Sequence, residues 1–194
     1  MDDSPVNQTP TQSSSSWLKT YYFTRAAVST IWVVAVVALG KNVPISALLA
    51  MAYPAWDAAA NWLDAQKSGG LRANPSQTLN LVISVITAVA VAVALDVSMN
   101  AVIDVFGAWA ILSGLLQLAT AIRRWKSANA QWVMVLSGAQ SAVAAVVFFQ
   151  KAAAATPPSI VVVAPYATVG AFYFLLSALW LTFKKASRTA PVPT

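Results

Sequence analysis

The sequence predicts an all-α fold: an integral membrane bundle of six transmembrane helices arranged as three repeated helical hairpins. Composition is the first observation, because 58% of the 194 residues are hydrophobic and only 9% are charged, whereas soluble domains carry about a quarter charged residues. The second is the length of the apolar runs, since about 20 helical residues cross a bilayer core of roughly 30 Å. The third is a repeat with basic clusters at its ends.

The clearest span covers residues 98–122 and ends in a basic cluster around Trp125. An amphipathic ring beside cations is typical of the lipid headgroup level. The residues that we interpret as topology anchors after this span and after the last one are Arg123, Arg124, Lys126, Lys184 and Lys185.

A repeat relates this span to two other segments. Tyr53 and Trp56 align with Phe106 and Trp109, and a third copy begins near residue 170. Each copy follows a simpler run rich in Val and Ala, so each pair of runs predicts one helical hairpin.

The chain divides into a tail, a membrane domain and a second tail. Residues 1–20 are mostly Ser, Thr, Gln and Pro before the first apolar run, which predicts a disordered cytoplasmic tail. No cleavable signal peptide is recognisable, so we expect the first helix to stay in the protein. The membrane domain covers residues 21–185, and a short tail covers 186–194.

Turn-forming residues place the boundaries of the six spans. Gly40 ends the first span, and Pro44 suits the first turn of the next. Pro54 should kink the second span, and Ser98 suits the N-cap of the fourth. The Val-rich third span is helical because lipid offers its backbone no partners. The predicted spans are about 21–40, 44–65, 79–95, 98–122, 131–150 and 159–183.

The distribution of cations predicts the orientation. Of the twelve lysines and arginines, only Lys41 and Lys151 fall on the side opposite the termini. Positive residues near helix ends favour the cytoplasm. We therefore expect a multi-pass protein of the bacterial inner membrane with both termini cytoplasmic.

Three polar residues of the second span are the main site candidates. Asp57, Asn61 and Asp64 are spaced to share one helix face. A carboxylate near the membrane centre costs roughly 2.5 to 3.5 kcal/mol, so Asp57 should face the bundle interior. One interpretation is a proton or cation relay. The other is a structural network in which Asn61 bonds across helices and Asp64 pairs with Arg25. The aligned positions in the other repeats are Ala110 and Tyr173, so no threefold carboxylate ring exists.

Asp104 is the remaining candidate, an acid about two turns into the fourth span. It would face either an aqueous vestibule or neighbouring polar groups. Gln117 and Gln140 are the deepest amides, and no cation is expected deep enough to pair with Asp57 or Asp104. The small residues that we interpret as helix-packing positions are Gly107, Ala110, Ser113, Gly114, Ser137, Gly138 and Ser141.

The composition disfavours catalysis. The chain has no His and no Cys, which removes common metal ligands and every His-containing triad. No phosphate-binding or dinucleotide-binding glycine pattern is present. We therefore expect no enzyme activity, no cofactor, no metal site and no nucleic-acid partner.

The segments YPAWDAAANWLDAQKS and FGAWAILSGLLQLATAIRRWKS, together with the hairpin repeat, resemble the bacterial short-repeat (DUF308-type) membrane proteins that include the acid-resistance protein HdeD. The resemblance implies a six-helix inner-membrane protein linked to acid or envelope stress, of unknown molecular activity. Asp57, Asn61 and Asp64 depart from the family pattern. The alternative is a small proton- or solute-coupled transporter or channel that uses Asp57 and Asp64. The lipid bilayer is the expected partner, and a homo-oligomer or a membrane complex stays open.

Overall fold

The computed structural model describes residues 10–123 and 131–186, and in this part of the chain helices are joined by turns and loops, without strands. The long helices are α1 (Pro10–Leu39), α2 (Val43–Lys67), α3 (Pro75–Leu95), α4 (Met99–Arg123), α5 (Gln131–Ala152) and α6 (Ala164–Ala186). Two short 3₁₀ helices, η1 (Leu71–Ala73) and η2 (Ile160–Val163), precede α3 and α6. The expected all-α class is confirmed for the described residues.

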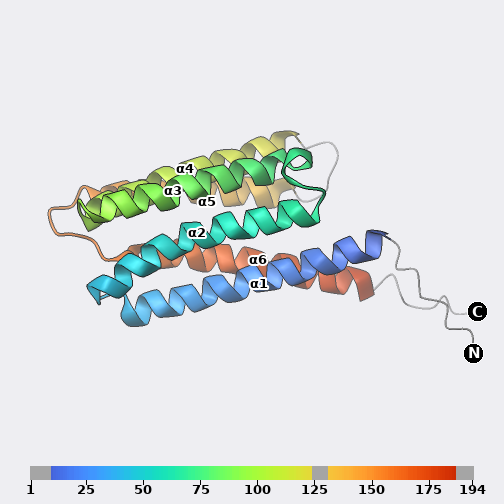
Figure 1. Cartoon of the computed structure of the whole chain (residues 1–194), viewed down its shortest axis with the longest axis horizontal. Coiled ribbons are helices and arrows are strands. Elements are labelled where there is room, and N and C mark those ends of the chain that lie inside the picture. Colours follow the sequence, from blue (N-terminus) through green and yellow to red (C-terminus); the bar gives the residue numbers. More distant parts are fainter. Residues whose placement is uncertain (1–9, 124–130, 187–194) are drawn as a thin grey trace, which may run out of the picture.

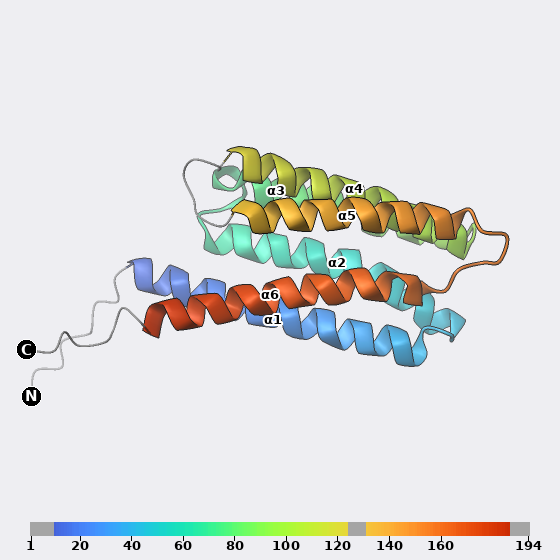
Figure 2. The ribbon, with the colours of Figure 1, turned by 180° about the vertical axis from the view of Figure 1, so that it is seen from behind.

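The long helices run up and down along one common direction (Figure 1). The start of α1, the end of α6 and η1 lie at one end of the bundle, and the turns after α1 and α3 lie at the other. α1 and α6 run side by side in both views (Figure 2). α2 crosses the middle of the bundle, between this pair and the group formed by α3, α4 and α5.

Within residues 10–123 and 131–186, five helices are long and apolar enough to cross a membrane, which makes the chain a multi-pass membrane protein. The five candidate spans are Ser16–Leu39, Pro75–Leu95, Met99–Ala119, Val135–Ala152 and Ile160–Phe183. Their outward side chains are apolar and exposed, as at Val34, Ile86 and Val143, which suits a lipid environment. α2 is as long as α4 but is not among the five. It is the helix that carries Asp57, Asn61 and Asp64.

The packing does not show three separate hairpins. The most extensive contacts join α4 with α5, α1 with α6, and α2 with α3, whereas α5 and α6 share very few. Contacts between the expected hairpins are thus larger than those within them. For α4 and α5 the reason is side-chain size, because small residues let these two helices approach closely.

The α4–α5 contact confirms the packing role of the small residues. A Cβ added at Gly114 would lie 2.9 Å from the Ser141 Cβ and 3.1 Å from the Gly138 carbonyl oxygen. A Cβ at Gly138 would lie 2.7 Å from the Leu118 Cγ. Gly107 similarly leaves room for the ring of Phe149. Glycine is therefore required where the two backbones meet.

Several helices begin at other residues than the predicted spans. α1 begins at Pro10, not near residue 21, and a hydrogen bond from Trp17 to Asp64 joins this early part of α1 to α2. The expected tail over residues 10–20 is therefore helical. α3 begins at Pro75, since proline suits a first helical turn. The expected last span starts as η2 and becomes α-helical at Ala164. Some predictions lie outside the described residues, namely those for residues 1–9 and 187–194 and for the anchors Arg124 and Lys126.

Candidate functional site

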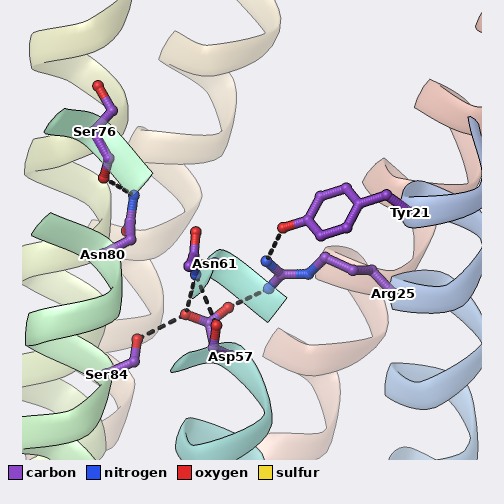
Figure 3. Close-up of polar contacts among 7 residues, drawn as sticks. All are labelled: Tyr21, Arg25, Asp57, Asn61, Ser76, Asn80 and Ser84. Atoms are coloured by element: carbon purple, nitrogen blue, oxygen red, sulfur yellow. Dashed lines mark hydrogen bonds and ion pairs between the residues drawn. The ribbon is translucent and has the colours of Figure 1, made fainter. Parts of the chain in front are cut away.

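Asp57 lies at the centre of a polar cluster that joins three helices (Figure 3). Its Oδ1 pairs with the Nη2 of Arg25 on α1. Its Oδ2 accepts hydrogen bonds from Ser84 Oγ on α3 at 2.7 Å and from Asn61 Nδ2 at 3.0 Å. The same Asn61 amide donates to the Asp57 carbonyl oxygen at 2.8 Å. Both carboxylate oxygens are thus partnered, as a buried charge requires.

Arg25 also contacts side chains other than Asp57. Its Nη1 donates to the Tyr21 hydroxyl at 3.0 Å, and its guanidinium carbon lies 4.2 Å from the centre of the Phe174 ring on α6. The exposed fractions of the two charged side chains are 11% for Arg25 and 18% for Asp57. The cluster therefore ties α6, α1, α2 and α3 together through one ion pair.

This ion pair corrects two expectations. Arg25 pairs with Asp57 and not with Asp64, and a cation does lie deep enough to partner Asp57. The reason is the length of α1. Because its apolar span begins at Ser16, Arg25 lies inside the membrane segment and not at its end.

Asp64 belongs to a separate contact nearer the end of α2. Its Oδ1 accepts from Trp17 Nε1 at 3.3 Å, and its Oδ2 accepts from Gln77 Nε2 at 3.2 Å. Asp64 is buried, with 6% of its surface exposed. It fastens the start of α1 and the start of α3 to α2, which fits the structural interpretation of this residue.

Asp104 does not join either cluster. Its side chain is exposed on α4, and it is not among the residues that line the central cavity described next. The structure therefore brings Asp57 and Asn61 together and leaves Asp64 and Asp104 outside that site.

Side chains from all six long helices line one central cavity of about 220 Å³. Its wall is rich in hydroxyl, amide and aromatic groups, and the Arg25–Asp57 pair forms part of it. The lining residues are Arg25, Tyr53, Asp57, Asn61, Asn80, Trp109, Ser113, Gln117, Ser137, Gln140, Ser141, Tyr166, Gly170, Tyr173 and Phe174. This polar interior contrasts with the apolar outer surface of the bundle.

Three buried polar atoms at this wall have no hydrogen-bond partner among the described residues. They are the Nε1 of Trp109, the Oε1 of Gln117 and the Nε of Arg25. Buried polar atoms are normally satisfied, because an unmade hydrogen bond costs about 1 to 3 kcal/mol. Each atom belongs to a residue that lines the cavity, which makes that residue a candidate for binding a solute.

Sequence reasoning found part of this wall. Gln117 and Gln140 stand out as deep amides, and Tyr173 aligns with Asp57 in the repeat. The contributions of Tyr53, Trp109 and Tyr166 were missed, since aromatic residues in a span are usually packing elements. Tyr53 does pack, stacking on Trp32 at 4.3 Å between ring centres, yet it also lines the cavity.

The cavity offers hydrogen bonds and one neutralised ion pair. No group of three His, Cys, Asp or Glu side chains that could hold a metal ion occurs within residues 10–123 and 131–186. The arrangement can bind and orient a small polar molecule, since donors and acceptors converge on it from every side.

Comparison with known proteins supports the short-repeat character of the chain. Residues 82–150, from within α3 to within α5, match the family model described as "Short repeat of unknown function (DUF308)". No curated protein and no solved structure matches the chain. The matched segment covers less than half of the sequence and contains Trp109, Gln117 and Gln140 of the cavity wall. The chain is thus a multi-pass membrane protein with a segment similar to the DUF308 short repeat.

Proposed function

We propose that the protein is a small transporter or channel that binds a polar solute in the central cavity. The observation that carries this proposal is the convergence of polar side chains from all six helices on one cavity inside an apolar bundle. Burying polar groups in a membrane protein is costly, and such groups commonly line solute or ion pathways. A bundle that only needed to pack would bury apolar residues here.

The Arg25–Asp57 pair is the electrostatic centre of the proposed site. It faces the cavity, and it connects α1 and α2, which otherwise share only a modest contact. Breaking a buried pair leaves an uncompensated charge, so a pair of this kind resists separation. Its proposed role is to hold these two helices in the arrangement that forms the wall.

A proton relay through both Asp57 and Asp64 has less support. Asp64 has its own partners and does not line the cavity. Of the acids on α2, only Asp57, paired with Arg25, is therefore assigned to the cavity wall, and Asp64 serves the attachment of α1 and α3.

Other expectations stay predictions. The link to acid or envelope stress and to HdeD rests on the resemblance alone, and the non-enzymatic role rests on composition. For orientation, the bundle supports the proposal that both termini are cytoplasmic in the bacterial inner membrane. Lys67 and Arg72 lie at the end of the bundle where α1 begins and α6 ends, and Lys41 and Lys151 lie near the other end.

Solute flux in liposomes that carry the purified protein tests the transport proposal. Gly170 is the position to change, because it lines the cavity and an added Cβ would meet only the Tyr53 hydroxyl, at 3.9 Å. We expect flux above that of empty liposomes for wild type and a clear loss for Gly170→Val, which narrows the cavity. Ala142→Val, on an exposed face of α5, is the matched control and should behave as wild type.

Small polar solutes and protons, the latter under an imposed pH gradient, are assayed in parallel. Folding is checked by size-exclusion chromatography and circular dichroism before reconstitution. Folded wild-type protein that gives no flux above empty liposomes contradicts the proposal and favours a structural or accessory role. Equal flux for wild type and Gly170→Val contradicts the assignment of the pathway to this cavity.

A further inference from the structure

We infer that the solute is a small, electrically neutral molecule bearing hydroxyl or amide groups, and that Trp109 and Gln117 recognise it. This inference rests on the proposed transport function and adds the chemical class of the substrate. It follows from the charge of the cavity, from the unpartnered polar atoms of residues that line it, and from its size.

The cavity wall carries no net charge. Among the described residues that line it, Arg25 and Asp57 are the only ones with charged side chains, and they neutralise each other. Three donors occupy the Asp57 carboxylate, from Arg25, Asn61 and Ser84. An ion entering this space would find no uncompensated opposite charge, and transferring an unpaired ion into a low-dielectric interior is costly. A neutral solute avoids this cost.

The unpartnered polar atoms of residues on the wall include both a donor and an acceptor on α4. Trp109 is 6% exposed, and its Nε1–H is without a partner in the described part of the chain. The Oε1 of Gln117 is the matching free acceptor. Trp109, Ser113 and Gln117 are spaced four residues apart, which places them on one face of the helix. Their backbone positions span about 12 Å along the helix axis at 1.5 Å per residue.

A solute that moves past Trp109, Ser113 and Gln117 meets a donor, the Trp109 Nε1–H, at one end and an acceptor, the Gln117 Oε1, at the other. Only a molecule that both accepts and donates hydrogen bonds satisfies each in turn. Hydroxyl and amide groups have this property, whereas a carboxylate only accepts and an ammonium group only donates. Trp109 and Gln117 together therefore favour uncharged polyols and amides over organic ions.

Size narrows the class further. The cavity holds about 220 Å³, below the range of roughly 300 to 1,000 Å³ typical of pockets for drug-sized ligands. Aromatic rings restrict it, since Tyr53 meets Trp109 edge to face at 5.8 Å between ring centres. Molecules the size of glycerol and urea are the appropriate probes.

The chain supplies a matched pair of tryptophans for the test. Trp56 aligns with Trp109 in the repeat, and its Nε1 also has no partner among the described residues. Trp56 does not line the central cavity, however, and instead borders a separate small pocket of about 60 Å³. Trp109→Phe and Trp56→Phe thus remove the same N–H group, inside and outside the proposed pathway.

The experiment measures entry of glycerol, urea, glycine, acetate and potassium into liposomes by light scattering, for wild type, Trp109→Phe, Gln117→Leu and Trp56→Phe. We expect wild type to speed entry of glycerol or urea over empty liposomes. One lost hydrogen bond is worth about 1 kcal/mol, so Trp109→Phe and Gln117→Leu should each slow this entry about threefold to tenfold. Trp56→Phe should leave it unchanged.

The outcomes distinguish the class of solute and its recognition from the transport function itself. If only acetate or potassium enters faster, the neutral-solute inference is overturned while transport stands. If only glycine enters faster, the assignment to hydroxyl or amide groups is overturned, because glycine is a zwitterion without either group. If glycerol or urea enters at the wild-type rate in both folded α4 variants, the recognition role of Trp109 and Gln117 is overturned. If no probe enters faster than in empty liposomes, the inference and the transport function both fail.

Discussion

Arg25 of α1 and Asp57 of α2 form an ion pair within a bundle whose outer surface is apolar. Around this pair, Tyr21 and Phe174 contact the guanidinium, and Ser84 and Asn61 contact the carboxylate. The pair is thus both a joint between helices and part of the cavity wall. The effects of mutating it should therefore appear in stability as well as in flux.

Substituting the two members of the pair should have unequal effects. In Asp57→Asn, Arg25 stays buried with a charge that it cannot lose, so unfolding in detergent should become easier by about 3 to 5 kcal/mol. In Arg25→Gln, Asp57 keeps its hydrogen bonds from Ser84 and Asn61. Arg25→Gln should therefore be less destabilising than Asp57→Asn in thermal or denaturant unfolding.

The double variant Arg25→Gln/Asp57→Asn is the control for this prediction, since it contains no unpaired charge. It should recover much of the stability lost in Asp57→Asn. Asp104→Asn, which changes an exposed acid on α4, should be close to wild type. Equal losses in all three variants of the pair would show that charge compensation is not what the pair contributes.

The α4–α5 contact should tolerate no added side chain at its centre. Gly114→Ala would place a Cβ 2.9 Å from Ser141 Cβ, and overpacking of this kind costs about 1 to 3 kcal/mol. Gly170→Ala adds the same methyl group where the nearest atom is 3.9 Å away, so it should be near neutral. Thermal unfolding of both variants in the same detergent measures the difference, and a Gly114→Ala protein as stable as Gly170→Ala would contradict the packing described above.

The Trp17–Asp64 hydrogen bond should stabilise the helical conformation of the early part of α1. Trp17→Phe keeps the ring that contacts Tyr21 but removes the donor to Asp64. We expect a loss of about 0.5 to 1.5 kcal/mol in local stability, seen as faster amide hydrogen exchange over residues 16–20. Solute flux should not change, because Trp17 is outside the central cavity. Reduced flux with unchanged exchange would assign the residue to the pathway instead.

The positive-inside rule makes the orientation testable with single cysteines, since the natural chain has none. In intact cells, Lys41→Cys should react with a membrane-impermeant maleimide, and Arg72→Cys should react only after the membrane is opened. The two positions lie at opposite ends of the bundle. The reverse labelling pattern would place both termini outside the cytoplasm.

Much of the fold could be predicted because lipid imposes strong local rules. Backbone groups in a bilayer must bond within their own segment, so a long apolar run is a helix whatever its β-propensity. The small residues of α4, among them Gly107 and Gly114, likewise indicated close packing. The boundaries were less predictable, because contacts far apart in sequence decide where a helix end stays ordered. Near the start of α1, for example, Trp17 contacts Asp64, 47 residues away.

The sequence by itself determined the helical class, the apolar spans and the polar face of α2, because composition and periodicity act within a single segment. Only the tertiary structure decided which cation partners Asp57. It also decided which helices lie next to each other, and that Trp109 and Gln117 share a wall with Tyr53 and Tyr166. The physical reason is that in lipid any two apolar helices can pack. Close approach at small residues and the pairing of buried charges select one arrangement, and both depend on all six helices together.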